Sequence, residues 1–155
     1  VYRLRGVRMT NIIRVANYIL QKVGSTTTMK LEKLVYYCQA WSLAWDDKPL
    51  FDEVFEAWAY GPVCPELFEH HKSKFTLKAD FFDDCQYSFD EEQKETMDAV
   101  IEYYGERSPH WLSELTHKER PWKDARKGYA PGDPCHEIIT KESMLAYYGA
   151  MVGDE

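Results

Sequence analysis

The sequence lacks the features that define several common classes of protein. No stretch approaches the roughly 20 consecutive apolar residues that a helix needs to cross a bilayer, and no secretory signal segment is present. The chain also contains no internal repeat and no low-complexity run. We therefore expect a folded cytoplasmic protein that does not insert into a membrane.

The sequence also lacks the spacing of a metal site. Four cysteines occur, at Cys38, Cys64, Cys85 and Cys135. None forms a C-x-x-C pair, and their separations match no zinc template. His70-His71 and Cys135-His136 remain as candidate ligands, but neighbouring residues on a helix point in different directions and rarely hold one ion together. The prediction is a protein without metal or other cofactor.

Basic residues are few. The chain has 19 Lys and Arg against 26 Asp and Glu, and three of its arginines lie within the first eight residues. This balance disfavours nucleic acid as a partner and favours a basic protein, although an acidic surface can also serve solubility alone. The run from Asp80 to Glu92 (DFFDDCQYSFDEE) is open to the same two interpretations: it either steers a basic partner or forms a solvated loop that caps a helix.

Apolar and aromatic residues, by contrast, are abundant. The 155 residues are 45% hydrophobic, with 5 Trp, 11 Tyr and 7 Phe. This length suits one domain, and so many rings cannot all be deeply buried in it. Some rings are therefore expected on a recognition surface, which also allows a homodimer. Residues 1–8 lack periodicity and are interpreted as an extra segment, either from an early start codon or added by cloning, so the predicted domain is 9–155.

The pattern of the chain predicts a compact, mainly α domain with a small β element. Apolar spacing and capping residues predict helices over 11–23, 29–45, 65–72, from 90 to 105, from 108, from 121 and after Thr140. Thr28 is the expected N-cap of the second helix, which is apolar nearly all round and should therefore be central. Short strands are predicted near 54–60 and 75–89, the second pairing with the first, with a turn at Gly61-Pro62.

One cluster raises the alternative of a small hydrolase. Ser113, Glu114 and His117 lie within one predicted helix. However, no G-x-S-x-G elbow and no glycine-rich donor loop accompanies them, so the parts of a nucleophilic site are incomplete. A structural hydrogen bond of His117 near the end of its helix is the favoured interpretation, and we expect no enzymatic activity.

Four blocks of sequence resemble one family in the order that the family shows. They are Lys30-Leu31-x-Lys33-Leu34-x-Tyr36-Tyr37 with Ala40-Trp41 and Leu43; Pro49-Leu50-Phe51 with Phe55-Glu56-Ala57-Trp58-x-Tyr60-Gly61-Pro62-Val63 and Pro65-Glu66-Leu67; Leu112-Ser113-x-Leu115-Thr116-His117 with Pro121-Trp122; and Ile139-Thr140, Glu142 and Tyr147-Tyr148. The chain is thereby similar, over about Thr10 to Met151, to the Panacea domain of SocA-like and GepA-like phage-associated antitoxins. It departs from the family pattern at Cys64, at Arg120 and over 129–137.

The resemblance implies an antitoxin that binds and neutralises a cognate toxin, which is usually encoded by the adjacent gene. A SocA-like branch implies an alternative, an adaptor that delivers the toxin to a cytoplasmic protease. A third alternative, a transcriptional repressor, is disfavoured because the chain shows no helix-turn-helix and no basic recognition helix.

The expected partner-binding residues come from the aromatic blocks. They are Trp58, Tyr60, Pro62, Glu114, His117 and Trp122. Tyr60 follows a predicted strand at a turn, where burial is difficult, so it is the favoured anchor. Trp58 and Trp122 have an alternative role, which is to pack the strand against the helices.

Overall fold

The computed structural model describes residues 11–82 and 88–153. The predicted extra segment 1–8 lies outside these residues, as do Asp83, Asp84 and Cys85 of the acidic run. Within the described residues helices dominate and every strand is short, which confirms the predicted mainly α fold with a small β element. No helix in these two ranges is long and apolar enough to span a membrane.

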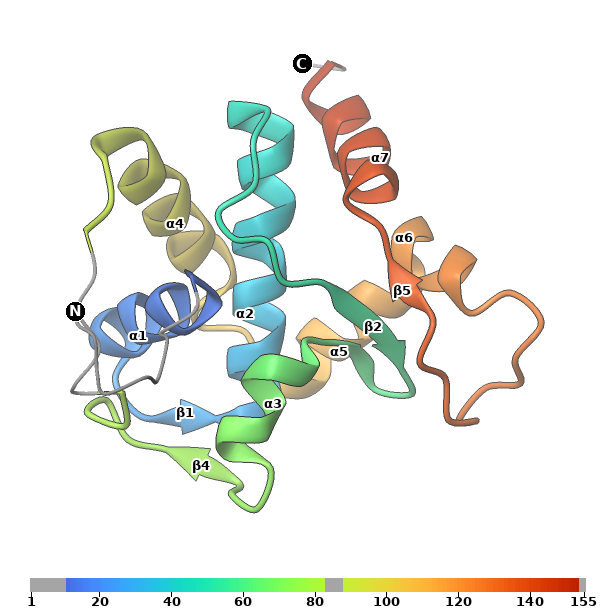
Figure 1. Cartoon of the computed structure of the whole chain (residues 1–155), viewed down its shortest axis with the longest axis horizontal. Helices are drawn as coiled ribbons and strands as arrows, with labels where there is room; N and C mark the ends of the chain where they lie inside the picture. The colour runs from blue at the N-terminus through green and yellow to red at the C-terminus, as the bar shows by residue number, and fades with distance from the viewer. Residues whose placement is uncertain (1–10, 83–87, 154–155) are drawn as a thin grey trace.

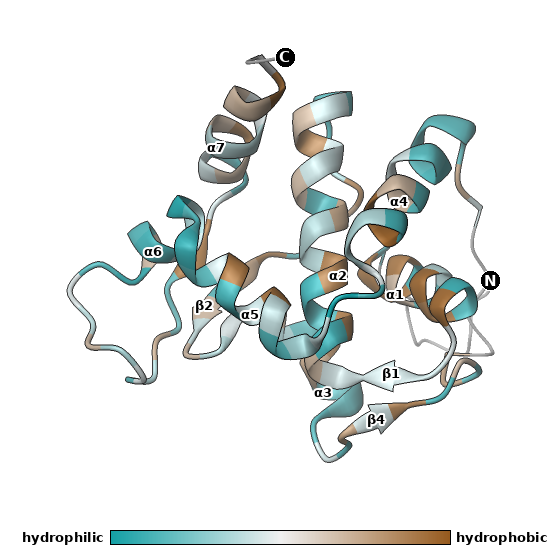
Figure 2. Ribbon diagram, turned by 180° about the vertical axis from the view of Figure 1, so that it is seen from behind, coloured by the Kyte–Doolittle hydropathy of each residue, from teal (hydrophilic) through white to brown (hydrophobic). Residues whose placement is uncertain are grey.

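Helix α2 (Thr28–Trp41) runs through the centre of the molecule (Figure 1). The helices that contact it are α1 (Asn11–Val23), α4 (Glu91–Tyr104), α5 (Pro109–Lys118) and α7 (Lys141–Gly153). Ten consecutive residues of α2, 31–40, are buried, so the helix is enclosed on all sides as its apolar pattern predicted. Figure 2 shows hydrophobic residues on α1 and α2, whereas α6 (Arg120–Ala125) is mostly hydrophilic.

The ends of α2 differ in detail from the prediction. The side chain of Thr27, not Thr28, caps the helix by accepting the N–H of Lys30 at 3.1 Å. Beyond Trp41 the helix widens into a π-helical turn, η1 (Ser42–Asp46), which packs against α7. A π turn inserts a residue without breaking the helix, so the apolar period alone does not reveal it.

Two predictions about the strands were wrong, one about a turn and one about a pairing. Gly61-Pro62 is not a turn after the first strand but part of β3 (Gly61–Val63), which pairs antiparallel with β2 (Phe55–Trp58). A third strand, β5 (Ile138–Ile139), completes this sheet and was not predicted. The predicted strand near 75–89 is β4 (Thr76–Leu77), and it pairs with β1 (Thr26–Thr27) instead of β2.

The predicted helix caps were mostly correct because their signals are local. Asp90 and Gln93 form the predicted capping box of α4, and Ser108 caps α5. Thr140 accepts the N–H of Ser143 at 3.1 Å at the start of α7. Helix α3 (Pro65–His71) begins at its predicted proline. These caps fix where each helix begins and so which side chains reach the sheet.

A buried hydrogen-bond network fixes α7 against α2. The carboxylate of Glu119, between α5 and α6, accepts the hydroxyls of Tyr37 at 2.7 Å and Tyr148 at 2.6 Å. The Tyr148 hydroxyl also lies 3.2 Å from that of Tyr36. Because buried polar groups are costly when unpaired, this network determines how α7 sits on the centre of the fold.

Candidate functional site

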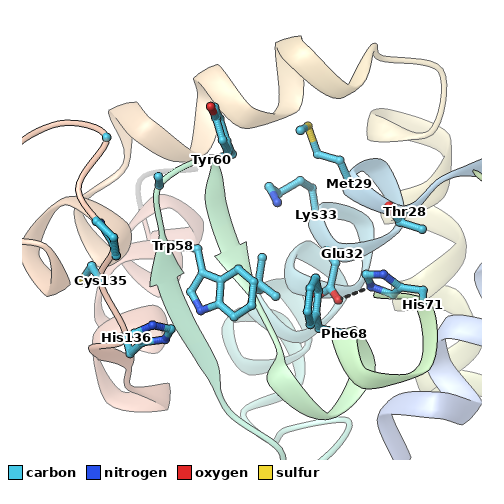
Figure 3. A pocket seen from close by; sticks show the side chains of 14 residues that line it. Thr28, Met29, Glu32, Lys33, Trp58, Tyr60, Phe68, His71, Cys135 and His136 are labelled. Atoms are coloured by element: carbon cyan, nitrogen blue, oxygen red, sulfur yellow. Dashed lines mark hydrogen bonds and ion pairs between the residues drawn. The ribbon is translucent and has the colours of Figure 1, made fainter. Parts of the chain in front are cut away.

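A pocket of about 370 Å³ opens between the tip of the β2–β3 hairpin, the first turns of α2, and α3 (Figure 3). Its volume lies in the range of small-molecule and side-chain pockets, and its walls are mostly apolar. The loop before β5 closes the remaining side. Its lining residues include Met29, Glu32, Lys33, Trp58, Tyr60 and Phe68.

The hairpin tip presents one large ring to solvent. The side chain of Tyr60 is 71% exposed, among the most exposed large hydrophobic residues that the structure describes. Its backbone, in contrast, is fixed, because Ser113 Oγ on α5 donates to the Tyr60 carbonyl at 2.6 Å. The tip is therefore an exposed aromatic ring on a rigid support.

Trp58, the last residue of β2, and Trp122 of α6 connect the hairpin to its neighbouring helices. The Trp122 indole N–H donates to the Trp58 carbonyl at 2.9 Å, and the Trp58 indole N–H donates to Glu56 Oε1 at 2.8 Å. Trp58 is half-buried and packs edge-on against Phe68 of α3. Both tryptophans thus pack the sheet against helices, and Trp58 also lines the pocket.

Lys33 lies at the floor of the pocket and passes beneath Gly61. The Lys33 side chain is 1% exposed, and its Nζ donates to the Pro62 carbonyl at 3.2 Å. Gly61 has φ +124°, and a Cβ at this position would overlap Lys33 Cε. Only glycine combines this backbone conformation with so close an approach. Pro62 itself is buried, so its side chain shapes the tip from within.

Burial makes the charged form of the Lys33 amine less favourable. It lowers the pKa of the Lys33 amine to about 8, and the nearby Glu32 carboxylate opposes this shift only partly. The physical reason is that removing an ammonium from water disfavours its charged form. The pocket floor therefore holds a cation that is incompletely stabilised.

Glu32 is engaged with α3 instead. Its Oε1 accepts the N–H of Cys64 at 3.0 Å, and its Oε2 lies 2.7 Å from Nε2 of His71, as the dashed line in Figure 3 shows. A carboxylate only accepts, so Nε2 is the donor. Both Glu32 and His71 are buried. This pair holds α3 against α2 and so positions the wall of the pocket that α3 forms.

Arg126 holds the loop before β5, which forms the wall of the pocket opposite α3. It is 5% exposed and donates to three backbone carbonyls, those of Ala57, Ala130 and Asp133, at 2.8, 3.1 and 2.7 Å. The residues that this loop contributes to the pocket are Gly132, Pro134, Cys135 and His136. The buried guanidinium of Arg126 thus links the irregular region 129–137 to the Ala57 carbonyl on β2.

The other predicted site residues lie away from the pocket. His117 stacks on Trp122 with ring centroids 4.0 Å apart, and burial lowers the pKa of His117. Its ring is hydrogen bonded to the backbone of Ala59, as the predicted structural role requires, whereas Nε2 is buried without a partner among the described residues. Glu114 is exposed on α5. The structure thus brings Trp58 and Tyr60 together at the pocket and leaves Glu114 outside it.

Potential metal ligands are dispersed in the structure. His71 pairs with Glu32, and His136 Nδ1 lies 2.9 Å from Glu56 Oε1. Over 11–82 and 88–153 no group of three or more His, Cys, Asp or Glu side chains could hold an ion. Cys38, Cys64 and Cys135 are free thiols and buried.

Sequence reasoning missed Glu32, Lys33, His71 and Arg126 as parts of the site. A signal was present for the first two, because adjacent charged residues stand within a helix that is apolar nearly all round. Such residues must be buried and paired, which marks them as unusual. His71 and Arg126 carry no comparable signal, since His71 pairs with Glu32, 39 residues away, and Arg126 reaches Ala57 on β2, 69 residues away.

Comparison with known proteins gives a family and no individual relative. No curated protein matches the chain, and no solved structure does. The family model described as "Antitoxin SocA-like, Panacea domain" matches residues 31–123. This match covers more than half of the chain and includes most of α2, both strands of the hairpin, α3 to α5, and the first part of α6. The chain therefore belongs to the SocA-like antitoxin family that carries the Panacea domain.

Proposed function

We propose that this chain is an antitoxin that neutralises a cognate toxin by direct binding, with the β2–β3 hairpin tip and its pocket as the contact surface. Membership of the antitoxin family supports the role. The observation that carries the location is Tyr60, a ring that is 71% exposed beside a mostly apolar pocket. Exposed aromatic anchors next to pockets are where the binding energy of protein interfaces concentrates.

The rigidity of this surface supports tight binding. Ser113 and Trp122 hold the backbone of Tyr60 and Trp58, and Arg126 holds the loop on the opposite wall. A surface that is already ordered loses less conformational entropy when a partner binds. The toxin is then masked in a stoichiometric complex, and its active surface is covered without any chemical step.

The arrangement around Ser113 supports binding rather than catalysis. Its hydroxyl donates to the Tyr60 carbonyl, and His117 stacks on Trp122. A nucleophilic serine needs a base that accepts its proton and donors for an oxyanion. Here the serine and histidine each have a structural contact, so we propose that the chain acts without turnover.

Co-expression with the product of the adjacent gene tests the proposal. Growth is measured with the neighbour alone, with both proteins, and with both in a host that lacks the main cytoplasmic proteases. We expect the neighbour to be toxic, rescue to persist without proteases, and the two proteins to co-purify. A rescue that requires a protease favours the adaptor alternative. If the neighbour is toxic and this chain does not rescue growth, the antitoxin proposal is wrong.

A further inference from the structure

The pocket floor carries a charge that its surroundings do not match. Among the residues that the structure describes, the one hydrogen-bond acceptor of Lys33 Nζ is the Pro62 carbonyl. An ammonium has three N–H donors, and a neutral carbonyl supplies less stabilisation than a carboxylate does. A neutral side-chain donor could bond to one carbonyl at a lower desolvation cost than a buried ammonium does.

The adjacent carboxylate does not remove this mismatch. Glu32 directs one oxygen to the Cys64 N–H and the other to His71. Figure 3 shows Glu32 turned toward His71, while the Lys33 amine extends toward the hollow between Trp58 and Met29. The cation therefore faces the pocket, and its nearest anion is bonded elsewhere.

The walls around this cation are apolar. Met29, Trp58, Val63 and Phe68 line the pocket, and the exposed ring of Tyr60 stands at its rim. A ligand that fits must be apolar along its length and anionic at its buried end. The volume of about 370 Å³ admits a short segment and excludes a folded element.

Resting on the function proposed above, we propose that this pocket receives a carboxylate carried on an apolar stem of the bound toxin, with Lys33 Nζ as the hydrogen-bond donor to that carboxylate. The chemistry is that of an apolar C-terminal residue with its terminal carboxylate. The new contact is a charge-assisted hydrogen bond in a site from which the apolar stem excludes water.

Two small probes with the same stem test this chemistry without the toxin. Hexanoate and hexan-1-ol are titrated separately into the full chain, and amide chemical shifts of the pocket residues are followed. We expect hexanoate to shift the resonances of Met29, Val63 and Phe68 and to bind about tenfold or more tightly than the alcohol. Equal binding of the two probes, or no shift by hexanoate, overturns the proposal.

A matched pair of variants separates Lys33 from general charge. Lys33→Met keeps the length of the side chain and removes the ammonium, so the preference for hexanoate should disappear. Lys30→Met removes the same charge one helical turn away, outside the pocket, and should leave the preference unchanged. Loss of the preference in both variants contradicts a specific role for Lys33.

The unaltered protein provides a test that does not depend on how a variant folds. The amine is charged below its pKa of about 8 and neutral above it, so the preference for hexanoate should fall between about pH 6.5 and about pH 9.5. The other titratable groups that line the pocket are Glu32, Tyr60, His71, Cys135 and His136. Outside the lining, the Cys64 N–H bonds to Glu32, and His117 interacts electrostatically with Lys33. Burial raises the pKa of the Cys64 thiol and lowers that of His117, so neither changes charge in this range. A pH-independent preference contradicts the proposal.

The outcomes separate this inference from the antitoxin function. If the chain binds and neutralises its toxin but hexanoate does not enter the pocket, the inference fails and the function stands. If hexanoate binds through Lys33 but co-expression gives no rescue, the pocket chemistry stands and the antitoxin proposal fails.

Discussion

At the scale of single residues, the contact of Lys33 with Gly61 explains why two distant sequence blocks belong together. The lysine stem lies where a side chain at position 61 would have to be, and its amine reaches the next carbonyl. Gly61 is therefore required twice, once by its φ of +124° and once by the approach of Lys33. The hairpin tip that presents Tyr60 depends on this contact.

Replacing this glycine should destabilise the protein strongly. We expect Gly61→Ala to lower the free energy of unfolding by about 2–4 kcal/mol, because it adds an overlap with Lys33 to the backbone strain. Gly128→Ala is the matched control, since Gly128 also has positive φ but nothing lies within 4 Å of its added Cβ. Its cost should be the strain alone, about 1–2 kcal/mol. Equal costs in urea unfolding would show that the Lys33 contact is unimportant.

At the scale of elements, the position of α7 depends on one buried carboxyl group. Burial is the largest cause that raises the pKa of Glu119, and hydrogen bonds from Tyr148 and Tyr37 oppose it. The folded state therefore holds the proton on Glu119 more firmly than the unfolded state. It follows that ionisation of Glu119 costs stability as pH rises from the unfolded pKa through the raised folded pKa.

This sign predicts how an amide replacement behaves. Glu119→Gln can still accept both tyrosine hydroxyls but does not ionise. We expect its destabilisation to be largest near about pH 4.5 and to shrink toward about pH 7, as the ionised wild-type carboxylate loses its advantage. Glu114→Gln on the exposed face of α5 should show no such trend. Urea unfolding at the two pH values measures this, and a cost that grows with pH contradicts the assignment.

The elements also show which parts of the fold the sequence could predict. The cap at Ser108 and the capping box at Asp90 were predictable because their partners lie three residues away. The pairing of β4 with β1 was not, since two-residue strands carry too little alternation to specify a partner 50 residues distant. Tyr60 was predictable as an exposed ring because it stands beside Gly61-Pro62, whereas the bond from Arg126 to the Ala57 carbonyl joins residues 69 positions apart and leaves no local pattern.

At the scale of the whole molecule, the domain is expected to need nothing before Met9. Residues 1–8 carry no apolar periodicity in the sequence, and the family match starts at residue 31. A chain that begins at Met9 should therefore melt within about 2 °C of the full chain. A chain that begins at Ala16 loses Ile12, Ile13 and Val15 from the core and should not fold. A large loss of Tm in the first truncation would place residues 1–8 within the domain.

The most direct test of the hairpin tip as the toxin-binding surface is the affinity of the purified chain for the adjacent-gene toxin. Calorimetric titration is carried out with the wild type, Tyr60→Ala, and Tyr103→Ala as a matched control, because Tyr103 is 60% exposed on α4, away from the hairpin. We predict a one-to-one complex that Tyr60→Ala weakens by at least about 2 kcal/mol, roughly 30-fold, and that Tyr103→Ala leaves within about 0.5 kcal/mol. Unchanged affinity in Tyr60→Ala, or a larger loss in Tyr103→Ala, would contradict the hairpin tip as the toxin-binding surface.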